Sequence, residues 1–255
     1  MTRPTSRIGG DLEVNRLGYG AMRLTGQPGN FGPFADWQGG VALLRTAADL
    51  GVQFFDSAWA YGPQTADQIV GEALEGRDVV VATKGGVDKP EPGRIVVDGS
   101  RDTLLRQVDQ ALVNLRRDRI DLFQLHRVDP ETPIETSVAA LAEARADGRI
   151  GHIGLSNVTL VDLDRALATA PIASVQNRFN MAETEANDLV DLTAARGIAF
   201  IPYGPLGANP MQRGAKLEPR DALAWLLRRS PNIVVIPGTT SIAHLEENWR
   251  AWELV

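Results

Sequence analysis

The chain has 255 residues, of which 44% are hydrophobic and 23% are charged, as in ordinary globular domains. Its net charge of -6 and the lack of any basic run argue against a nucleic-acid partner. The absence of cysteine excludes disulfides, thiolate catalysis and zinc–thiolate sites. No apolar run reaches the roughly 18 residues of a membrane span, and no secretory signal is visible. We therefore expect a cytoplasmic protein without a membrane partner.

A short hairpin is predicted first, at 7–14, with Gly9-Gly10-Asp11 at its turn. Strands are then predicted at 16–21, 52–56, 79–84, 120–125, 151–155, 173–176, 199–203 and 233–236. Helices are predicted between and after them, at 39–50, 66–75, 101–115, 134–146, 161–168, 185–195, 220–229 and 242–252. No linker interrupts the alternation.

Eight strand–helix units predict one α/β domain over residues 1–255, a (β/α)8 TIM barrel behind the hairpin. The alternative is an open doubly wound sheet. That fold would carry Gly-x-Gly-x-x-Gly after its first strand, and the motif is absent here.

Four side chains stand where the predicted strands end, which is where barrels of this kind gather their functional groups. Asp56 and Tyr61 follow the second predicted strand, Lys84 ends the third, and His126 follows the fourth. Only three of the 26 Lys and Arg residues are lysines, so a lysine at a strand end suggests a specific role for Lys84. Each residue alone also has a structural explanation: a solvated strand end for Lys84, a structural histidine, a loop cap for Asp56, and packing for Tyr61. Their convergence on neighbouring strands favours the functional interpretation.

The four residues form a coherent set for proton transfer. A phenol is a poor acid at neutral pH, and a buried ammonium beside Tyr61 is expected to lower its pKa. Asp56 would hold Lys84 charged and in place, and His126 would orient a carbonyl oxygen. Tyr61 would then protonate that oxygen. The electron pair must come from a bound hydride donor, since no residue of the set supplies one.

Several motifs in order resemble the aldo-keto reductases over almost the whole chain. They are Asp56-x-Ala58-x-x-Tyr61-Gly62, Thr83-Lys84, His126 and Gly154-Leu155-Ser156-Asn157. The resemblance implies an NADPH-dependent enzyme that reduces an aldehyde or ketone, with Asp56, Tyr61, Lys84 and His126 as its catalytic tetrad.

The same resemblance implies a set of cofactor-binding residues. They are Met22, Ser156, Asn157, Gln176, Tyr203, Leu206, Gly207, Gly238, Thr239, Thr240, Ser241, His244, Glu247 and Asn248. Ser156, Asn157 and Gln176 would bind the carboxamide, and Tyr203 would stack on the nicotinamide ring. Thr240 and Ser241 also open a predicted helix, whose backbone amides suit a phosphate.

A finer likeness is to the bacterial pyridoxal reductase branch, carried by 14–22, 224–233 and 236–241. It raises an aromatic aldehyde such as pyridoxal as the substrate. Met22, Phe31 and Trp59 would form an apolar wall for that ring, although Trp59 alone is equally explained by packing.

Two departures from the family pattern bear on cofactor and substrate. His244 stands where many members have an arginine for the 2′-phosphate, so NADPH is expected with NADH as the alternative. The sequence ends at Val255, after the last predicted helix, so a pocket open on one side is expected.

Two other functions are weighed against the reductase. A cofactor-binding regulatory subunit with little turnover could use the same barrel. A metal-dependent hydrolase is disfavoured, because His152 and His244 do not cluster with carboxylates in the predicted fold. We expect no metal, and a monomer or weak homo-oligomer.

Overall fold

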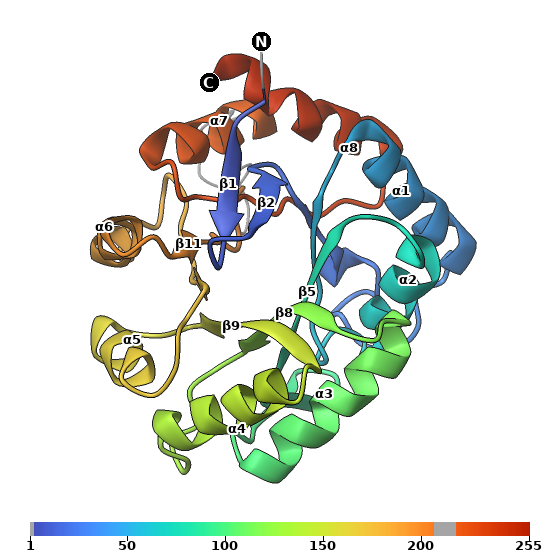
Figure 1. Cartoon of the computed structure of the whole chain (residues 1–255). Coiled ribbons are helices and arrows are strands. Elements are labelled where there is room, and N and C mark those ends of the chain that lie inside the picture. Colours follow the sequence, from blue (N-terminus) through green and yellow to red (C-terminus); the bar gives the residue numbers. More distant parts are fainter. Residues whose placement is uncertain (1–2, 207–217) are drawn as a thin grey trace.

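The computed structural model describes residues 3–206 and 218–255. Seven parallel strands form one curled sheet in the order β11-β10-β9-β8-β5-β4-β3, and the helices surround it (Figure 1). The strands are β3 (Tyr19–Gly20), β4 (Phe54–Asp56), β5 (Val80–Gly85), β8 (Ile120–Leu125), β9 (Ile150–Ser156), β10 (Ser174–Gln176) and β11 (Ala199–Phe200). The helices are α1 (Trp37–Leu50), α2 (Thr65–Leu74), α3 (Arg101–Leu115), α4 (Ile134–Ala146), α5 (Leu160–Leu167), α6 (Asn187–Ala195), α7 (Pro219–Arg229) and α8 (Ile242–Trp249). The fold is thus an α/β barrel-like fold.

The predicted strand at 233–236 is not a regular strand in the structure. Its residues instead form isolated parallel bridges, Ile233 to Phe200 on one side and Val235 to Leu17 on the other. The Gly18 amide donates to the Val235 carbonyl at 2.8 Å, and the Val235 amide donates to the Arg16 carbonyl at 2.9 Å. The segment therefore forms one bridge with the chain at each side, which is too few for a regular strand ladder. It still connects the two edges of the sheet.

Two antiparallel hairpins accompany the sheet. The first, β1 (Thr5–Ile8) with β2 (Leu12–Asn15), crosses the ring of strands in Figure 1. Its residues Ile8 and Val14 are completely buried. Its turn places Oδ1 of Asp11 2.7 Å from Nε2 of His152. The second, β6 (Val87–Glu91) with β7 (Arg94–Val97), follows directly on β5 and was not predicted from the sequence.

Alternation along the strands separates two apolar layers. Phe54, Ala82 and Leu122 point inward and pack with the first hairpin, whereas Phe55, Val81 and Phe123 point outward to the helices. The inward positions that follow, nearer the carboxyl ends of the strands, are polar. They are Asp56, Lys84, Gln124, Ser156 and Gln176, all at most 2% exposed. The fold therefore concentrates buried polar groups at one end of an otherwise apolar barrel interior.

Helix ends follow local sequence signals. Ser100 caps α3, Thr159 and Asp162 form a capping box at α5, and Gly51 ends α1 in a left-handed conformation (φ 102°). α1 begins at Trp37, two residues before the predicted start, behind its cap Asp36. Short 3-10 turns cover Ala21–Arg23 (η1) and Arg250–Leu254 (η2).

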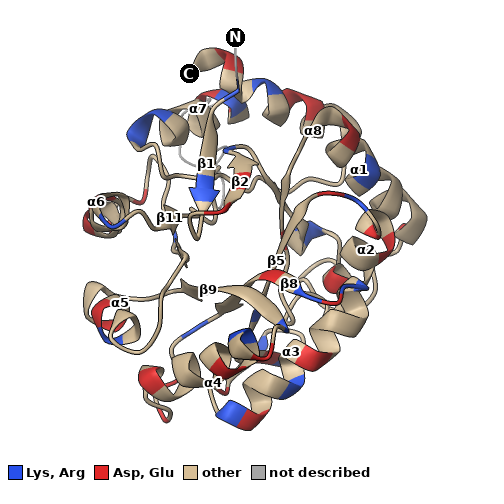
Figure 2. Ribbon diagram, in the orientation of Figure 1, with Lys and Arg blue, Asp and Glu red and all other residues tan. Residues whose placement is uncertain are grey.

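Charged residues lie mainly on the outer helices and connecting loops (Figure 2). Within the described part of the chain, no helix combines the length and hydropathy needed to cross a bilayer.

Candidate active site

A buried ion pair forms the centre of the polar layer. The Nζ of Lys84 lies 2.7 Å from Oδ2 of Asp56 and donates a second bond of 2.7 Å to the carbonyl oxygen of Ser57. Lys84 is 0% exposed and Asp56 is 1% exposed. Such a pair repays its desolvation only when the remaining lone pairs and protons are also satisfied.

Two glutamines donate the remaining hydrogen bonds to Asp56. Gln124 on β8 and Gln176 on β10 donate their Nε2 groups to Oδ1 of Asp56, at 3.1 and 2.9 Å. Gln176 had been expected as a carboxamide-binding residue, and the structure shows its amide bound to the carboxylate. Gln124 was missed, because it stands inside the predicted strand 120–125; its inward register beside Lys84 was the signal that could have found it.

Tyr61 and His126 lie against this pair. The Lys84 Nζ donates to the Tyr61 Oη at 3.4 Å. The His126 ring meets the Tyr61 ring edge-on, with centroids 6.0 Å apart. Both side chains are partly open to solvent, and the buried Nδ1 of His126 has no hydrogen-bond partner within the described residues. The structure therefore brings together all four residues predicted as the tetrad: Lys84 contacts Asp56 and Tyr61, and the His126 ring packs against the Tyr61 ring.

Burial is the largest influence on the pKa values of Tyr61, Lys84 and His126. Burial raises the pKa of Tyr61 above its usual value, although the neighbouring Lys84 charge works to lower it. The expectation of a lowered pKa was therefore wrong in its net sign, and right only for the contribution of Lys84. Burial also works to lower the pKa of Lys84, but the Asp56 carboxylate and the Tyr61 oxygen outweigh it and raise that pKa.

The imidazole of His126 is neutral at physiological pH. Burial, reinforced by the charges of Lys84 and Arg127, holds its pKa well below the usual value. A neutral imidazole beside a phenol that stays protonated can donate hydrogen bonds without carrying charge.

The segments after β9 and β11 are linked through Asn157, which adopts a left-handed backbone conformation (φ 56°). Its amide nitrogen donates to the His126 carbonyl and to the Ser156 hydroxyl, both at 3.0 Å. Its Oδ1 accepts from the Tyr203 hydroxyl at 2.7 Å. Asn157 is thus fully engaged with protein partners, and it fixes the Ser156 hydroxyl and the Tyr203 ring relative to His126.

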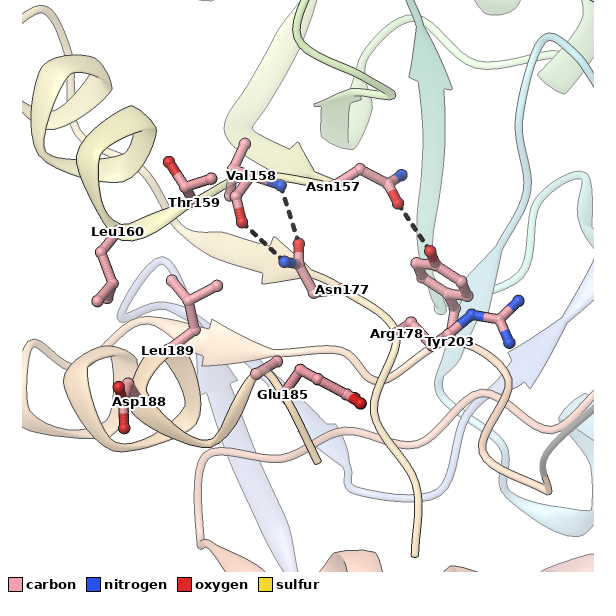
Figure 3. A pocket seen from close by; sticks show the side chains of 11 residues that line it. Asn157, Val158, Thr159, Leu160, Asn177, Arg178, Glu185, Asp188, Leu189 and Tyr203 are labelled. Atoms are coloured by element: carbon pink, nitrogen blue, oxygen red, sulfur yellow. Dashed lines mark hydrogen bonds between the residues drawn. The ribbon is translucent and has the colours of Figure 1, made fainter. Parts of the chain in front are cut away.

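A pocket of about 470 Å³ opens beside these residues, between the first turns of α5 and α6 (Figure 3). It is lined by Asn157, Val158, Thr159, Leu160, Asn177, Arg178, Glu185, Ala186, Asp188, Leu189 and Tyr203. Asn177 closes its inner wall by exchanging hydrogen bonds with the backbone of Val158. The guanidinium of Arg178 lies 5.5 Å from the centre of the Tyr203 ring.

The predicted phosphate loop leads into α8. The Thr239 carbonyl accepts from the buried Tyr19 hydroxyl at 2.6 Å, and Ser241 caps the helix at the His244 amide. Within this loop Gly238 and Thr240 are exposed. Along the helix the His244 side chain is exposed, Glu247 is half-buried and Asn248 is buried.

The remaining predicted residues lie at several depths around the site. Met22 is 40% exposed and Phe31 half-exposed, and Phe31 bridges to Gly62, beside Tyr61. Trp59 is only 6% exposed, and its indole nitrogen donates to Asp88 of the second hairpin at 3.3 Å. Leu206 packs partly buried against the core. Gly207 lies outside the described residues.

Across residues 3–206 and 218–255, no group of three His, Cys, Asp or Glu side chains is arranged to hold a metal ion. His152 pairs with Asp11, whereas His244 is exposed on α8.

The sheet is parallel and barrel-like, and a lysine, a carboxylate, a tyrosine and a histidine lie at the C-terminal ends of its strands. This arrangement is typical of an enzyme active site. Residues 16–222 match the model of the Aldo/keto reductase family. The chain belongs to this family, and it is an oxidoreductase that acts on carbonyl compounds and binds a nicotinamide cofactor.

Relatives cover nearly the full chain. The chain is 40% identical to pyridoxine 4-dehydrogenase of Escherichia coli, over 96% of this chain and 92% of that protein. It is 36% identical to an uncharacterized oxidoreductase of Schizosaccharomyces pombe, over 95% of this chain and 83% of the other. These likenesses are consistent with the pyridoxal reductase-like branch.

Solved structures agree in fold. An aldo-keto reductase from Klebsiella pneumoniae in complex with NADPH superposes with a TM-score of 0.84 at 25% identity, covering 100% of this chain and 91% of that one. The glycerol dehydrogenase of Gluconobacter oxydans gives a TM-score of 0.85 at 23% identity, covering 99% and 95%.

Proposed function

We propose that this chain reduces an aldehyde or ketone to the alcohol with NADPH, and that Tyr61 donates the proton. The observation that carries the proposal is the contact of the Lys84 ammonium with both Asp56 and Tyr61, at 2.7 and 3.4 Å. An ammonium held against a phenol stabilises the negative charge that remains after the proton has left.

In this mechanism each residue has a distinct part. The neutral His126 donates a hydrogen bond to the substrate oxygen and orients it toward the Tyr61 hydroxyl. Tyr61 gives its proton to that oxygen as the C–O bond becomes single. Lys84 balances the phenolate, and Asp56, supported by Gln124 and Gln176, holds the ammonium in place.

The polar groups of the carboxyl edge fit a nicotinamide. Ser156 offers a hydroxyl fixed by Asn157, and Tyr203 offers a flat ring fixed by the same side chain. NADPH, when bound, would supply the hydride that adds to the carbonyl carbon. The residues that would hold it elsewhere are Met22, Leu206, Gly207, Gly238, Thr239, Thr240, Ser241, His244, Glu247 and Asn248.

We infer an aromatic aldehyde such as pyridoxal as the substrate. The relative with 40% identity is named for oxidation of pyridoxine, which is the reverse of aldehyde reduction. Met22 and Phe31 are exposed enough to meet a ring, whereas Trp59 is largely buried.

We further infer that residues 233–236 act as the eighth strand of a (β/α)8 barrel. The first hairpin would close one end of this barrel. Residues 1–255 would form a single domain. The paired bridges to Leu17 and Phe200 support this.

The proposal is tested by following NADPH oxidation by absorbance across a panel of aldehydes and ketones that includes pyridoxal. We expect turnover with aldehydes, and the highest kcat/KM with an aromatic one. Tight NADPH binding without turnover on any member of the panel would instead favour the regulatory-subunit alternative.

Cofactor preference is tested at His244, whose exposed side chain lies in the first turn of α8. His244→Arg is expected to raise the ratio of NADPH to NADH efficiency about tenfold, because arginine pairs permanently with a phosphate. An unchanged ratio would place the 2′-phosphate away from residue 244.

A further inference from the structure

Helix α2 carries a buried carboxylate that the proposed proton transfer does not use. Asp67 is 0% exposed, and both of its oxygens accept from the Thr83 hydroxyl, at 3.0 and 3.1 Å. The Ser57 hydroxyl approaches the same carboxylate, but it lies outside good hydrogen-bond geometry. A buried carboxylate with so few donors is costly to the fold, so its presence calls for an explanation.

Asp67 is connected to the proposed catalytic residues by two short routes. Thr83 directly precedes Lys84 on β5, and its side chain points outward to α2 whereas that of Lys84 points inward. Ser57 directly follows Asp56, and its carbonyl accepts from the Lys84 ammonium at 2.7 Å. Asp67 therefore lies beside Thr83 on the helix side of β5, whereas the neighbouring Lys84 side chain points into the barrel and binds Asp56.

We propose that Asp67 is a positioning residue for the Tyr61–Lys84 pair: it anchors the strand segment that carries Lys84 through the Thr83 hydroxyl, and its negative charge disfavours ionisation of the Tyr61 phenol. This inference rests on the proposed role of Tyr61 as proton donor. Asp67 would then be the second carboxylate, after Asp56, whose charge acts on Tyr61.

Simple electrostatics fixes the sign of the effect. A buried negative charge disfavours formation of a phenolate nearby, whereas the Lys84 ammonium favours it. Asp67 is one of the charges that raise the pKa of Tyr61, after the larger effect of burial and the effect of Asp56. Burial raises the pKa of Asp67 itself to about 6, so the carboxylate is largely ionised at pH 7.

The other charges around α2 act elsewhere. Lys84 on β5 and Asp56 on β4 are the charged groups that act on the Asp67 carboxylate from the sheet. From α1, Arg45 reaches the carbonyls at the C-terminal end of α2. Arg116, which caps α3, pairs with the surface Glu75. Among the described residues, the charges that act on Tyr61 are those of Lys84, Asp56 and Asp67.

The experiment is a direct titration of Tyr61. The chain has three tyrosines, so protein labelled with ¹³C at the tyrosine ring gives a spectrum that Tyr61→Phe assigns. We expect Asp67→Asn to lower the midpoint of Tyr61 ionisation by about one pH unit, and Lys84→Met to raise it. The basic limb of the kcat profile should move with the midpoint, while the KM for NADPH stays unchanged.

Two matched variants separate charge from packing. Asp67→Glu keeps the charge and is expected to keep the Tyr61 midpoint. Asp121→Asn removes a carboxylate that binds the Val81 amide at the far end of the same strand, and is expected to leave the midpoint in place. Asp67→Ala gives the same charge removal should the asparagine variant not fold.

A folded Asp67→Asn protein whose Tyr61 titrates at the wild-type midpoint would overturn the inference, as would an equal shift in Asp121→Asn. The titration needs no turnover. Failure of the wild-type protein to reduce any carbonyl would therefore refute the proposed function without deciding the role of Asp67.

Discussion

Two carboxylates, Asp56 and Asp67, are buried near the β5 residues Thr83 and Lys84, and they differ in their hydrogen-bond partners. Asp56 accepts from Lys84, Gln124 and Gln176, whereas the hydrogen bonds that reach Asp67 come from Thr83. An isolated carboxylate in an apolar setting resists ionisation. That difference decides which of the two holds the cation and which one modulates the site.

The raised pKa of Asp67 predicts a pH-dependent cost to stability. Its folded value of about 6 lies above the unfolded value, so its contribution is fully present below about pH 4 and is lost as pH rises through 6. Asp67→Asn removes this loss. Chemical denaturation should show the unfolding free energy of the variant, relative to wild type, rising by about 2 kcal/mol between pH 4 and pH 7. An equal difference at both pH values would contradict the assignment.

The sequence predicted which residues lie together at the candidate site better than it predicted their electrostatics. Lys84 was found because lysine is rare in this chain, and Tyr61 and His126 because they follow predicted strands. Gln124 and Asp67 were missed, because a glutamine in a strand and an aspartate in a helix look unremarkable until the packing around them is known. The sign of the Tyr61 shift was wrong for the same reason: burial is a property of the assembled fold.

At the scale of elements, the second hairpin is the feature that the strand–helix alternation concealed. Its sequence contains Pro90, Pro92 and Gly93, which are typical of loops, and its strands are short. Its first strand is held by tertiary contacts: Asp88 accepts from the Trp59 indole, and the Lys89 ammonium binds the carbonyls of Gly29 and Asn30. Such contacts cannot be read from a local pattern.

Those contacts make a prediction about local stability. Asp88→Ala removes the acceptor of the Trp59 indole and of the Lys89 amide, at 3.3 and 2.9 Å. Hydrogen exchange should become about tenfold faster across 87–97, with the global unfolding midpoint nearly unchanged.

Arg94→Ala is the matched control, because its exposed pair with Glu91 contributes little. Equal exchange in the wild type and in Asp88→Ala would show that the hairpin does not depend on the Trp59 contact.

At the scale of the whole molecule, the barrel-like sheet must join its first and last segments. The sequence predicted eight strand–helix units, whereas the sheet has seven strands and the predicted eighth meets its neighbours through single bridges. Arg16 strengthens the junction: it is 6% exposed and donates to the carbonyls of Leu227, Ser230 and Ile233. Two of these carbonyls lie at or just after the end of α7, where a cation also complements the helix dipole.

Arg16→Met should therefore destabilise the fold far more than an ordinary surface change. It leaves buried carbonyls without donors, which costs about 2 to 4 kcal/mol. Urea unfolding measures this, with Arg7→Met as the control, since Arg7 forms an exposed pair with Glu13 and should cost under about 1 kcal/mol. Similar losses in both variants would contradict the role of Arg16 at the junction.

If the Tyr61 hydroxyl beside Lys84 is the proton source, then Tyr61→Phe should remove reduction and leave cofactor binding in place. The measurement is the single-turnover rate of aldehyde reduction by the NADPH-loaded protein, together with the Kd for NADPH. We expect the rate to fall at least about a hundredfold while the Kd changes less than about twofold, because the ring remains and only the proton donor is lost. A phenylalanine variant that reduces the aldehyde at the wild-type rate would contradict the account.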